Sequence, residues 1–494
     1  MNKLFFFILF QLVVIVTVAQ QKPNVIYIYA DDLGYGELGS YGQTKIKTPH
    51  LDKMAAEGMR FTQHYTGAPV CAPARCMLMT GKHSGNSYIR GNYELGEFED
   101  DREGGQMPLP ENTFTIAHLM KNAGYVTGAM GKWGLGMFDN TGNPNKQGFD
   151  YFYGYVDQKQ AHNFYPTHLW ENGKWDTLNN PFIYVHQRIK NKSPDSEFDR
   201  FKGKDYSIDK MVEKTVDFIK QNKNKPFFLY LPYTGPHVAL QAPDEAVKEY
   251  IGKFDEQPYY GEKGYAPSKY PLSTYAAMIT YMDKQIGKIN TLLKELGLEK
   301  NTLIMFSSDN GPTFDIGGAN TDFFQSTGGL RGKKQDLYEG GIRVPFIAKW
   351  PQKIKPASVS NLVSAQFDLM ATLSELTGTK AWNNDGVSLL PTLTGNNTIQ
   401  KQREYIYFEF PEKSGQVAIR MGNWKGVKSN MKKGKDVAYW ELFDLSKDSA
   451  EKTNLAAQHP QLIEKFEAII KKEHMRSHIK DWEFIDPKFV QTSQ

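Results

Sequence analysis

The stretch Val-Ile-Tyr-Ile-Tyr-Ala-Asp-Asp, residues 25–32, joins five bulky, mainly apolar side chains to a pair of carboxylates. Three further short apolar runs, at 126–130, 226–231 and 302–306, also lack a regular alternation of apolar and polar residues. This pattern is typical of strands that are covered on both faces in a mainly parallel sheet. The sequence therefore predicts a central sheet built from these four segments.

Polar residues follow each of the four runs. They are Asp31-Asp32, Lys132, His237 in Thr-Gly-Pro-His, and residues 308–311, which read Ser-Asp-Asn-Gly. Ligands of open α/β sheets bind outside the carboxyl ends of the strands. We therefore expect these polar residues to meet in one crevice although they are far apart in the sequence.

The apolar runs alternate with helical patterns, of which residues 274–298 are the clearest. This order predicts an α/β/α sandwich that extends from residue 20 to about Gly395, where Gly-Asn-Asn-Thr marks a linker. Residues 396–494 contain strand-like segments at 405–410, 416–421 and 440–445, and an amphipathic helix at about 460–474. They predict a smaller C-terminal α+β domain with an antiparallel sheet.

Length and charge exclude several classes of protein. With 494 residues, 40% of them hydrophobic, the chain can bury a large core in two unequal domains. The 59 basic and 55 acidic residues give a net charge of only +4. This mixed surface favours neither nucleic acid nor an acidic membrane as a partner.

The N-terminus has the pattern of an export signal. Lys3 precedes an apolar run from 4 to 16, and the small residue Ala19 stands before the polar pair Gln20-Gln21. We expect a signal peptide at residues 1–19 and a periplasmic or secreted protein; an uncleaved membrane anchor is the alternative. No other stretch could span a bilayer, so no stable membrane insertion is expected.

The two cysteines, Cys71 and Cys76, lie five residues apart in a segment that reads as the start of a helix. Helical spacing points their side chains in different directions, so we expect two free thiols. Pro73 suits a first helical turn and Arg75 stands one turn after Cys71, so amides, helix dipole and guanidinium would converge on an anion beside Cys71. From spacing alone, a low-pKa thiol and an ordinary capped helix remain open.

The pairs Asp31-Asp32 and Asp309-Asn310 offer oxygen ligands at the ends of two expected strands. Such a ligand set suits a hard cation, calcium or magnesium, although solvated turn residues are the alternative.

These motifs together resemble the type I sulfatases, whose signature C-x-P-x-R matches the segment from Cys71 to Arg75. Further blocks are similar and occur in the order found in that family: Asp31-Asp32, Gly131-Lys132-Trp133, Gly235-Pro236-His237, residues 308–311, and Lys334 with the nearby 338–341, Tyr-Glu-Gly-Gly. The resemblance covers nearly the whole mature chain and implies an alkaline-phosphatase-like fold. It also implies a sulfuric ester hydrolase whose cysteine is converted to formylglycine by a maturation enzyme.

The resemblance also implies roles for individual residues. A cation, calcium with magnesium as the alternative, would be held by Asp31, Asp32, modified Cys71, Asp309 and Asn310. Residue 71 would attack sulfur with help from Arg75, His237 would give a proton to the leaving alcohol, and Lys132 and Lys334 would neutralise the sulfate oxygens.

The chain departs from the family at Gly134, where relatives commonly have a histidine two residues after the lysine. The segment at 148–165 is rich in aromatic, amide and imidazole groups and resembles bacterial sulfatases that act on sulfated polysaccharides. We therefore expect a sulfated oligo- or polysaccharide substrate, with galactose or hexosamine units, contacted by Arg90, Gln158 and His162. His162 or deprotonated Lys132 would take the place of the missing histidine as a base.

Two alternatives remain at this stage. A formylglycine-dependent phosphodiesterase or phosphonate monoester hydrolase would use the same groups. A catalytically inactive glycan-binding protein would retain the Cys71 thiol.

Overall fold

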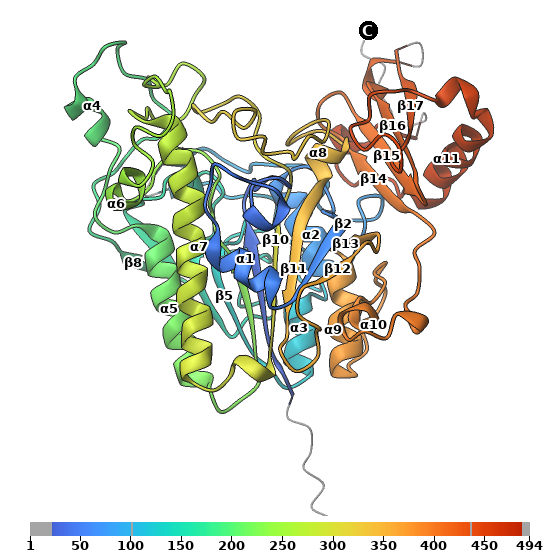
Figure 1. Ribbon diagram of the computed structural model, residues 1–494, viewed down its shortest axis with the longest axis horizontal. Helices are drawn as coiled ribbons and strands as arrows, with labels where there is room; N and C mark the ends of the chain where they lie inside the picture. Colours follow the sequence, from blue (N-terminus) through green and yellow to red (C-terminus); the bar gives the residue numbers. More distant parts are fainter. Residues whose placement is uncertain (1–21, 100–101, 435–436, 487–494) are drawn as a thin grey trace, which may run out of the picture.

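The computed structural model describes residues 22–99, 102–434 and 437–486 (Figure 1). Its centre consists of β1 (Asn24–Ala30), β5 (Val126–Lys132), β9 (Phe227–Pro232) and β10 (Thr302–Ser308), in the order β10-β1-β9-β5. All the neighbouring pairs in this group are parallel. All residues of β1, β9 and β10 are buried. The four apolar runs therefore form the predicted parallel centre of the sheet.

Further strands extend this centre to an 11-stranded sheet in the described part of the chain. On one side β11 (Arg343–Lys349) runs antiparallel to β10, and β2 (Met59–Tyr65) runs antiparallel to β11. On the other side β6 (Tyr151–Tyr155) continues the parallel order. Beyond β6 the sheet continues through β7 (His168–Glu171) to the edge strand β8 (Lys174–Thr177), and at the other end β12 (Ser358–Ser360) and β13 (Ser364–Ala365) pair with β2. The outer strands, which the apolar runs did not predict, make the sheet mixed.

Helices cover both faces of the sheet, so the predicted α/β/α sandwich is confirmed. One layer contains α1 (Pro49–Ala56), α5 (Ser207–Asn222) and α7 (Pro271–Glu295), and the other contains α2 (Cys71–Thr80), α3 (Ile116–Asn122) and α9 (Asp368–Thr377). The alternation of side chains along β1 explains the two layers, because Ile26 and Ile28 pack into one core and Val25, Tyr27 and Tyr29 into the other.

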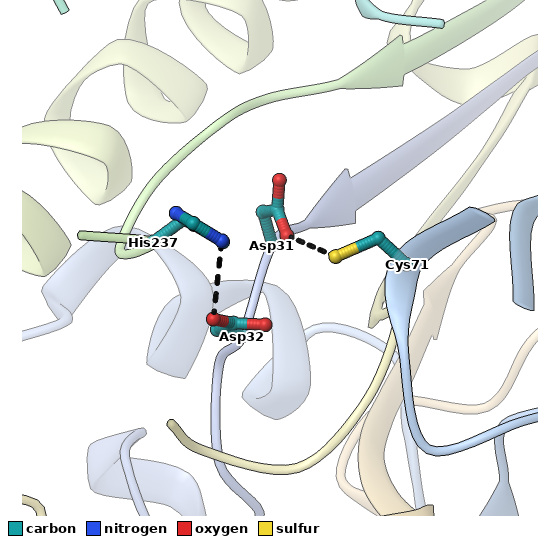
Figure 2. Close-up of side chains that lie close together, drawn as sticks. All are labelled: Asp31, Asp32, Cys71 and His237. Carbon is teal, nitrogen blue, oxygen red and sulfur yellow. Dashed lines mark hydrogen bonds and ion pairs between the residues drawn. The ribbon is translucent and has the colours of Figure 1, made fainter. Parts of the chain in front are cut away.

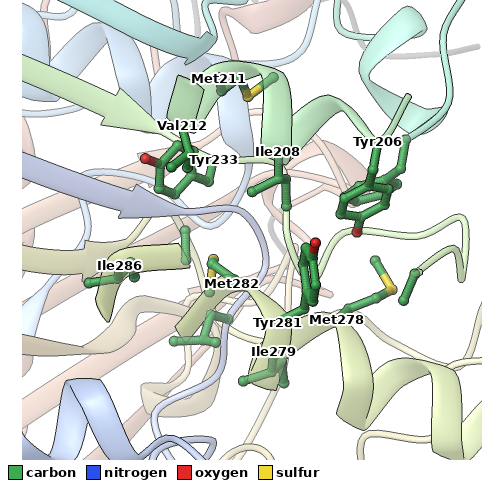
Figure 3. Close-up of a cluster of buried hydrophobic side chains, with 14 of the residues drawn as sticks. Tyr206, Ile208, Met211, Val212, Tyr233, Met278, Ile279, Tyr281, Met282 and Ile286 are labelled. Carbon is green, nitrogen blue, oxygen red and sulfur yellow. The ribbon is translucent and has the colours of Figure 1, made fainter. Parts of the chain in front are cut away.

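The core on the α5 and α7 side is shown in Figure 3. Ile208 and Met211 of α5 meet Met278 and Met282 of α7, and Tyr233 closes the cluster from the segment after β9. These residues recur at helical spacing, which is the pattern that predicted a helix at 274–298. The structure begins this helix three residues earlier, at Pro271, a favourable first-turn position.

The C-terminal sheet is antiparallel, as expected, and contains β14 (Ile406–Phe410), β15 (Gln416–Met421), β16 (Trp424–Ser429) and β17 (Tyr439–Asp444). Helix α11 (Pro460–Glu473) covers one face, where Phe466 and Ile470 pack against Ile419. The other face packs on the large domain, where Phe408 shares a core with Phe367. The sheet is therefore buried on both faces, and β16 is a strand that the sequence did not reveal.

The remaining short elements lie in the connections. They are α4 (Asp195–Asp199), α6 (Asp244–Lys248), α8 (Glu339–Ile342), α10 (Leu390–Leu393), β3 (Phe98–Glu99) and β4 (Arg102–Glu103). The expected linker at Gly395 falls between α10 and β14, and the expected signal peptide at 1–19 lies outside the described residues. None of the helices described here is both long and apolar enough to cross a membrane.

A buried ionic network connects the two sheets. His474, just after α11, places Nδ1 2.9 Å from Glu409 Oε2 and Nε2 3.1 Å from Glu483 Oε1. Glu409 on β14 also pairs with the guanidinium of Arg90 from the large domain. Burial alone would lower the pKa of His474, but the hydrogen bonds to Glu409 and Glu483 raise it to about 9. His474 is therefore a cation at neutral pH.

We predict that His474→Gln lowers the free energy of unfolding by about 2 kcal/mol or more at pH 6, because buried Glu483 loses the cation that it pairs with, while buried Glu409 keeps Arg90 but loses His474. A folded-state pKa above the unfolded value stabilises the protein fully below the unfolded pKa near 6.5. That contribution disappears as the pH rises through about 9. Denaturant unfolding at pH 6 and pH 9.5 should therefore show the difference between variant and wild type shrinking at the higher pH.

His478→Gln is the control. The ring of His478 stacks on Tyr88, and burial lowers the pKa of His478, so its removal should cost no more at pH 6 than at pH 9.5. An equal loss for His474→Gln at pH 6 and 9.5 would contradict the charged role of His474.

Candidate functional site

The residues of the candidate site lie at the carboxyl ends of the central strands. Asp31 and Asp32 follow β1, Lys132 ends β5, His237 follows β9, and 309–310 follow β10. All these side chains are buried, although they come from distant segments; Asp32 and Asn310, for example, are 278 residues apart. The crevice predicted from the strand ends is therefore formed (Figure 2).

A cavity of about 290 Å³ opens above these residues. Its walls include Cys71, Lys132, Gln158, His162, His237 and Lys334. Five polar residues that the sequence analysis did not single out also line it: Asn92, Glu94, Tyr265, Thr313 and Gln335. They belong to loops with no recognisable motif, and only the tertiary structure brings them here.

Cys71 is the first residue of α2, as expected, and Pro73 lies in the first turn. Its Sγ lies 3.3 Å from Asp31 Oδ1, and Figure 2 shows the two groups directed at each other. Cys71 and Cys76 are both free and buried, which confirms that they form no disulfide. Burial raises the pKa of the Cys71 thiol far above its ordinary value, and the charge of Asp31 adds to this effect. The idea of a low-pKa thiol is therefore wrong, because an unmodified Cys71 would be protonated.

Three cations converge beside residue 71. Arg75 Nη2 lies 2.9 Å from Asp309 Oδ2, and its other amino group donates to the carbonyl of Lys132 at 2.7 Å. The Lys132 Nζ lies 2.7 Å from Asp31, and the Lys334 Nζ lies 2.8 Å from Asp32. Together with the N-terminus of α2, these groups can bind a tetrahedral oxyanion.

Carboxylates balance these cations at the base of the crevice. Burial opposes ionisation of Asp31, but Lys132 and Arg75 hold the pKa of this group well below its usual range. The pKa of Asp309 is raised to about 7 by burial and by the charge of Asp31. Such closely placed carboxylates are costly unless further positive charge compensates them.

The donor set fits a divalent cation. Ligand atoms of Asp31, Asp32, Cys71 and His237 all lie within 4.8 Å of one another. Asn310 donates through Nδ2 to Asp32 at 2.7 Å, whereas its buried Oδ1 has no hydrogen-bond partner. An unpaired buried amide oxygen beside carboxylates is the kind of acceptor that a hard cation satisfies.

His237 is held in one tautomer. Its Nδ1 donates to the carbonyl of Val238, so Nε2 is the nitrogen that faces the crevice, 3.7 Å from Asp32 Oδ2. Burial lowers the pKa of His237 to about 4, and the charge of Lys334 acts in the same direction. Nε2 can therefore exchange a proton with a bound molecule while Nδ1 keeps the ring in place.

A second imidazole lies against His237. The His162 ring is stacked on it with centroids 4.8 Å apart and planes at 6°. His162 Nδ1 lies 3.1 Å from Nε2 of His186, an exposed side chain, and Tyr265 contacts His162 edge-on. Burial lowers the pKa of His162 well below its ordinary value, and His237 adds to the shift. The structure thus places a neutral imidazole against His237 and in contact with the exposed side chain of His186.

Gly134 and Gln158 are neighbours. A Cβ atom at Gly134 would lie 3.0 Å from Cγ of Gln158, and Gly134 has a φ of +69°. The left-handed backbone disfavours other residues there. The side chain of Gln158 thus occupies the space into which a side chain at position 134 would extend.

Arg90 is not brought to the crevice. Its side chain is only 4% exposed, and the guanidinium pairs with Glu409 and donates to the Ser87 carbonyl at 3.0 Å. The prediction that Arg90 contacts the substrate is therefore wrong, because Arg90 is buried and pairs with Glu409 of the C-terminal sheet. Asn92, two residues later, reaches the rim of the crevice instead and accepts from the Ala72 amide at 3.2 Å.

Comparison with known proteins agrees with this geometry. A family model described as "Sulfatase" matches residues 23–379, and one described as "N-sulphoglucosamine sulphohydrolase, C-terminal" matches 332–479. An N-acetylgalactosamine-6-O-sulfatase of Bacteroides thetaiotaomicron is 30% identical over 514 residues, which span 91% of this chain and 93% of that protein.

Solved structures are similar over nearly the whole chain. Ps i-CgsB in complex with k-i-k-neocarrahexaose has 28% identity and a TM-score of 0.72, over 96% of this chain and 94% of the other. A structure from work on glycosaminoglycan metabolism by Bacteroides thetaiotaomicron has 28% identity and a TM-score of 0.70, over 92% of this chain and 99% of the other.

Proposed function

Since this chain belongs to the sulfatase family and is therefore a sulfuric ester hydrolase, we propose that it removes sulfate from a sulfated glycan with a nucleophile made from Cys71. The observation that carries this proposal is the position of Cys71 at the N-terminus of α2, among Arg75, Lys132 and Lys334. These groups are arranged to hold a sulfate group against residue 71. The relatives that act on galactosamine sulfate or contain a carrageenan oligosaccharide support a galactose or hexosamine unit as the substrate.

The family generally uses formylglycine and a divalent cation. In this chain the conversion of Cys71 by a maturation enzyme would replace an unreactive thiol with an aldehyde, whose hydrate supplies two hydroxyls on one carbon. Asp31, Asp32, Asp309, Asn310 and modified residue 71 would hold calcium, or magnesium in its place. The cation would supply positive charge at a sulfate oxygen.

The protein side chains then divide the remaining work. Arg75, Lys132 and Lys334 bind the sulfate oxygens and stabilise the charge that develops on them. His237 gives the Nε2 proton to the departing sugar oxygen. Burial and then the charge of Lys334 lower the pKa of His237, and an anion bound at Lys334 would offset the second of these effects. It would therefore favour the imidazolium, the form that carries a proton on Nε2 as well as on Nδ1.

His162 is proposed as the base that completes the cycle. It stacks on His237 and is neutral because burial lowers its pKa. Its contact with exposed His186 offers a path for the accepted proton to solvent. Gln158 fills the space beside Gly134 but, as an amide, can only orient a ligand through hydrogen bonds.

We predict that His162→Ala separates the two halves of the reaction. The sugar alcohol should be released rapidly in one equivalent, whereas sulfate release should slow about 100-fold and the sulfate should remain covalently on the protein. Quenched-flow product analysis and intact mass measurement during turnover would show this. Loss of a pure substrate contact would instead raise KM and leave no retained sulfate.

His459→Ala is a matched control, because this histidine also contacts an aromatic ring, that of Trp424, but lies next to α11. It should leave both steps unchanged. If His162→Ala retains no sulfate, His162 is not this base.

A screen of sulfated oligosaccharides, with released sulfate as the readout, tests the proposed function. Phosphate and phosphonate esters of the same alcohols should be hydrolysed at least about tenfold more slowly; the reverse order would favour the phosphonate-hydrolase alternative. The glycan-binding alternative predicts two results together: protein from the native host keeps the Cys71 thiol, and it hydrolyses none of the esters.

Export and the division of the chain remain part of the proposal. The apolar N-terminus supports a signal peptide at 1–19 and a periplasmic or secreted location. Residues 20–395 would form the catalytic domain, and 396–494 the C-terminal domain that packs on it.

A further inference from the structure

A second hollow adjoins the catalytic crevice. It has a volume of about 570 Å³ and shares three residues with the crevice, namely Phe314, Lys334 and Gln335. Its other walls include Lys333 and Asp336 from the loop before α8, and Lys413 from the turn between β14 and β15. We call this hollow the lysine trough. It lies where the large domain meets the C-terminal sheet.

The trough has firm walls. Lys334 donates its backbone amide to the carbonyl of Pro312 at 2.9 Å, and Gln335 donates to that of Pro69 at 2.9 Å. Gln416 on β15 donates to the Gln335 carbonyl at 2.9 Å and so holds the loop against the C-terminal sheet. A binding surface built from such fixed segments loses little conformational freedom when a ligand binds.

Two adjacent lysines serve the two hollows separately. Lys334 extends to Asp32 in the catalytic crevice, whereas Lys333 Nζ lies 2.8 Å from Asp322, whose side chain is 82% exposed. Lys413, 50% exposed, pairs with Asp336. Each pair joins an exposed side chain to one that is about a fifth exposed, 20% for Lys333 and 19% for Asp336. Because solvent reaches one member of each pair and screens the charges, each pair contributes only about 1 kcal/mol. Lys333 and Lys413 can therefore exchange these partners for an anion of a ligand at little cost.

We propose that the lysine trough is a subsite for the sugar unit next to the one that loses its sulfate. Lys333 and Lys413 bind an anionic substituent of that neighbouring unit, a sulfate or a carboxylate. The half-buried ring of Phe314 lies at the junction of the two hollows and offers an apolar surface to a sugar ring. This inference rests on the proposed function and extends it: the preferred substrate carries anionic groups on consecutive units.

The test compares a monosaccharide with an oligosaccharide. N-acetylgalactosamine 6-sulfate, a 6-sulfated chondroitin tetrasaccharide with carboxylated neighbours, and a carrageenan oligosaccharide with sulfated neighbours are assayed with the wild type, Lys333→Ala, Lys413→Ala and the double variant. The same panel is titrated into the Cys71→Ala protein with and without the two lysine changes, so that affinity is measured without turnover. Lys465→Ala is the matched control, a lysine that is 51% exposed and paired with Glu404 on the C-terminal domain.

Each lysine change should raise the KM, or the Kd in the Cys71→Ala background, about tenfold for an oligosaccharide with an anionic neighbour. The values for the monosaccharide, and kcat throughout, should stay within twofold, as should every value for Lys465→Ala. If the lysine changes raise KM or Kd only for the oligosaccharide with sulfated neighbours, the trough binds sulfate; if they do so only for the one with carboxylated neighbours, it binds carboxylate.

The proposed subsite is overturned if the lysine changes raise KM or Kd equally for the monosaccharide and the oligosaccharides, or raise neither. Failure of the proposed function looks different, since the wild type would then release no sulfate from any member of the panel. In that case the titrations still decide whether the trough recognises the anion.

Discussion

Cys71→Ser should lower kcat by about 10⁴-fold or more and leave the fold intact. When a hydrolase works through a covalent intermediate, removal of its nucleophile lowers kcat by a factor of this order. A serine at position 71 could still receive sulfate, but its ester has no second hydroxyl on the same carbon with which to expel the group. The measurement is sulfate release with a substrate from the screen, together with the thermal unfolding temperature of the variant.

Cys76→Ser provides the matched control. Cys76 is buried one turn further along α2, where its sulfur accepts a hydrogen bond from Ser87 at 3.4 Å. This change should leave kcat within a few fold. Peptide mass spectrometry of the wild type from its native host should show residue 71 as formylglycine, and a fully intact thiol in active enzyme would refute the mechanism.

Removal of divalent cations should lower turnover by at least about 10³-fold, with calcium or magnesium restoring it. A cation on a sulfate oxygen contributes several kcal/mol to the transition state, and each 1.36 kcal/mol corresponds to a tenfold change in rate. Calcium should also raise the free energy of unfolding of the metal-free protein by about 2.7 kcal/mol when the calcium concentration is 100 times the Kd for calcium, because calcium binds only the folded state. Thermal unfolding with and without calcium therefore gives a readout besides activity.

Asp309→Asn should abolish both the activity and the stabilisation by calcium. Asp283→Asn is its control, because burial also raises the pKa of Asp283 to about 7. This carboxylate lies away from the crevice and accepts hydrogen bonds from the backbone amides of His50 and Leu51 in α1. The control should be less stable than the wild type but should keep the full calcium response. Full activity of metal-free enzyme would reject the cation site.

Much of the fold was readable from the sequence because it depends on local patterns. An unbroken apolar run such as 25–29 indicates a strand covered on both faces, whatever it pairs with. The polar residues that follow such runs must share one edge of a parallel sheet, which is why Asp31, Lys132 and Asp309 could be placed together. Likewise, Pro73 and the spacing to Arg75 were enough to place Cys71 at a helix N-terminus.

The rest depended on contacts that no local pattern records. Strand β2 has no continuous apolar run, and the run at 344–348 in β11 contains Pro345. The place of both strands in the sheet is set by pairing across more than 270 positions. Arg90 could be read as a substrate contact until its partner Glu409, 319 residues away, was seen to hold it. His186 and Tyr265 stand in loops without a motif, yet they surround His162.

The candidate nucleophile, the cationic side chains and the candidate metal ligands could thus be identified from the sequence alone, because most of them lie within a few residues of a strand end or a helix start. The tertiary structure alone revealed the surroundings of His162 and the trough of Lys333 and Lys413. The physical reason is the range of the interactions. Backbone hydrogen bonding and side-chain periodicity act over a few residues, whereas stacking, ion pairing and cavity shape arise only when distant loops are packed against each other.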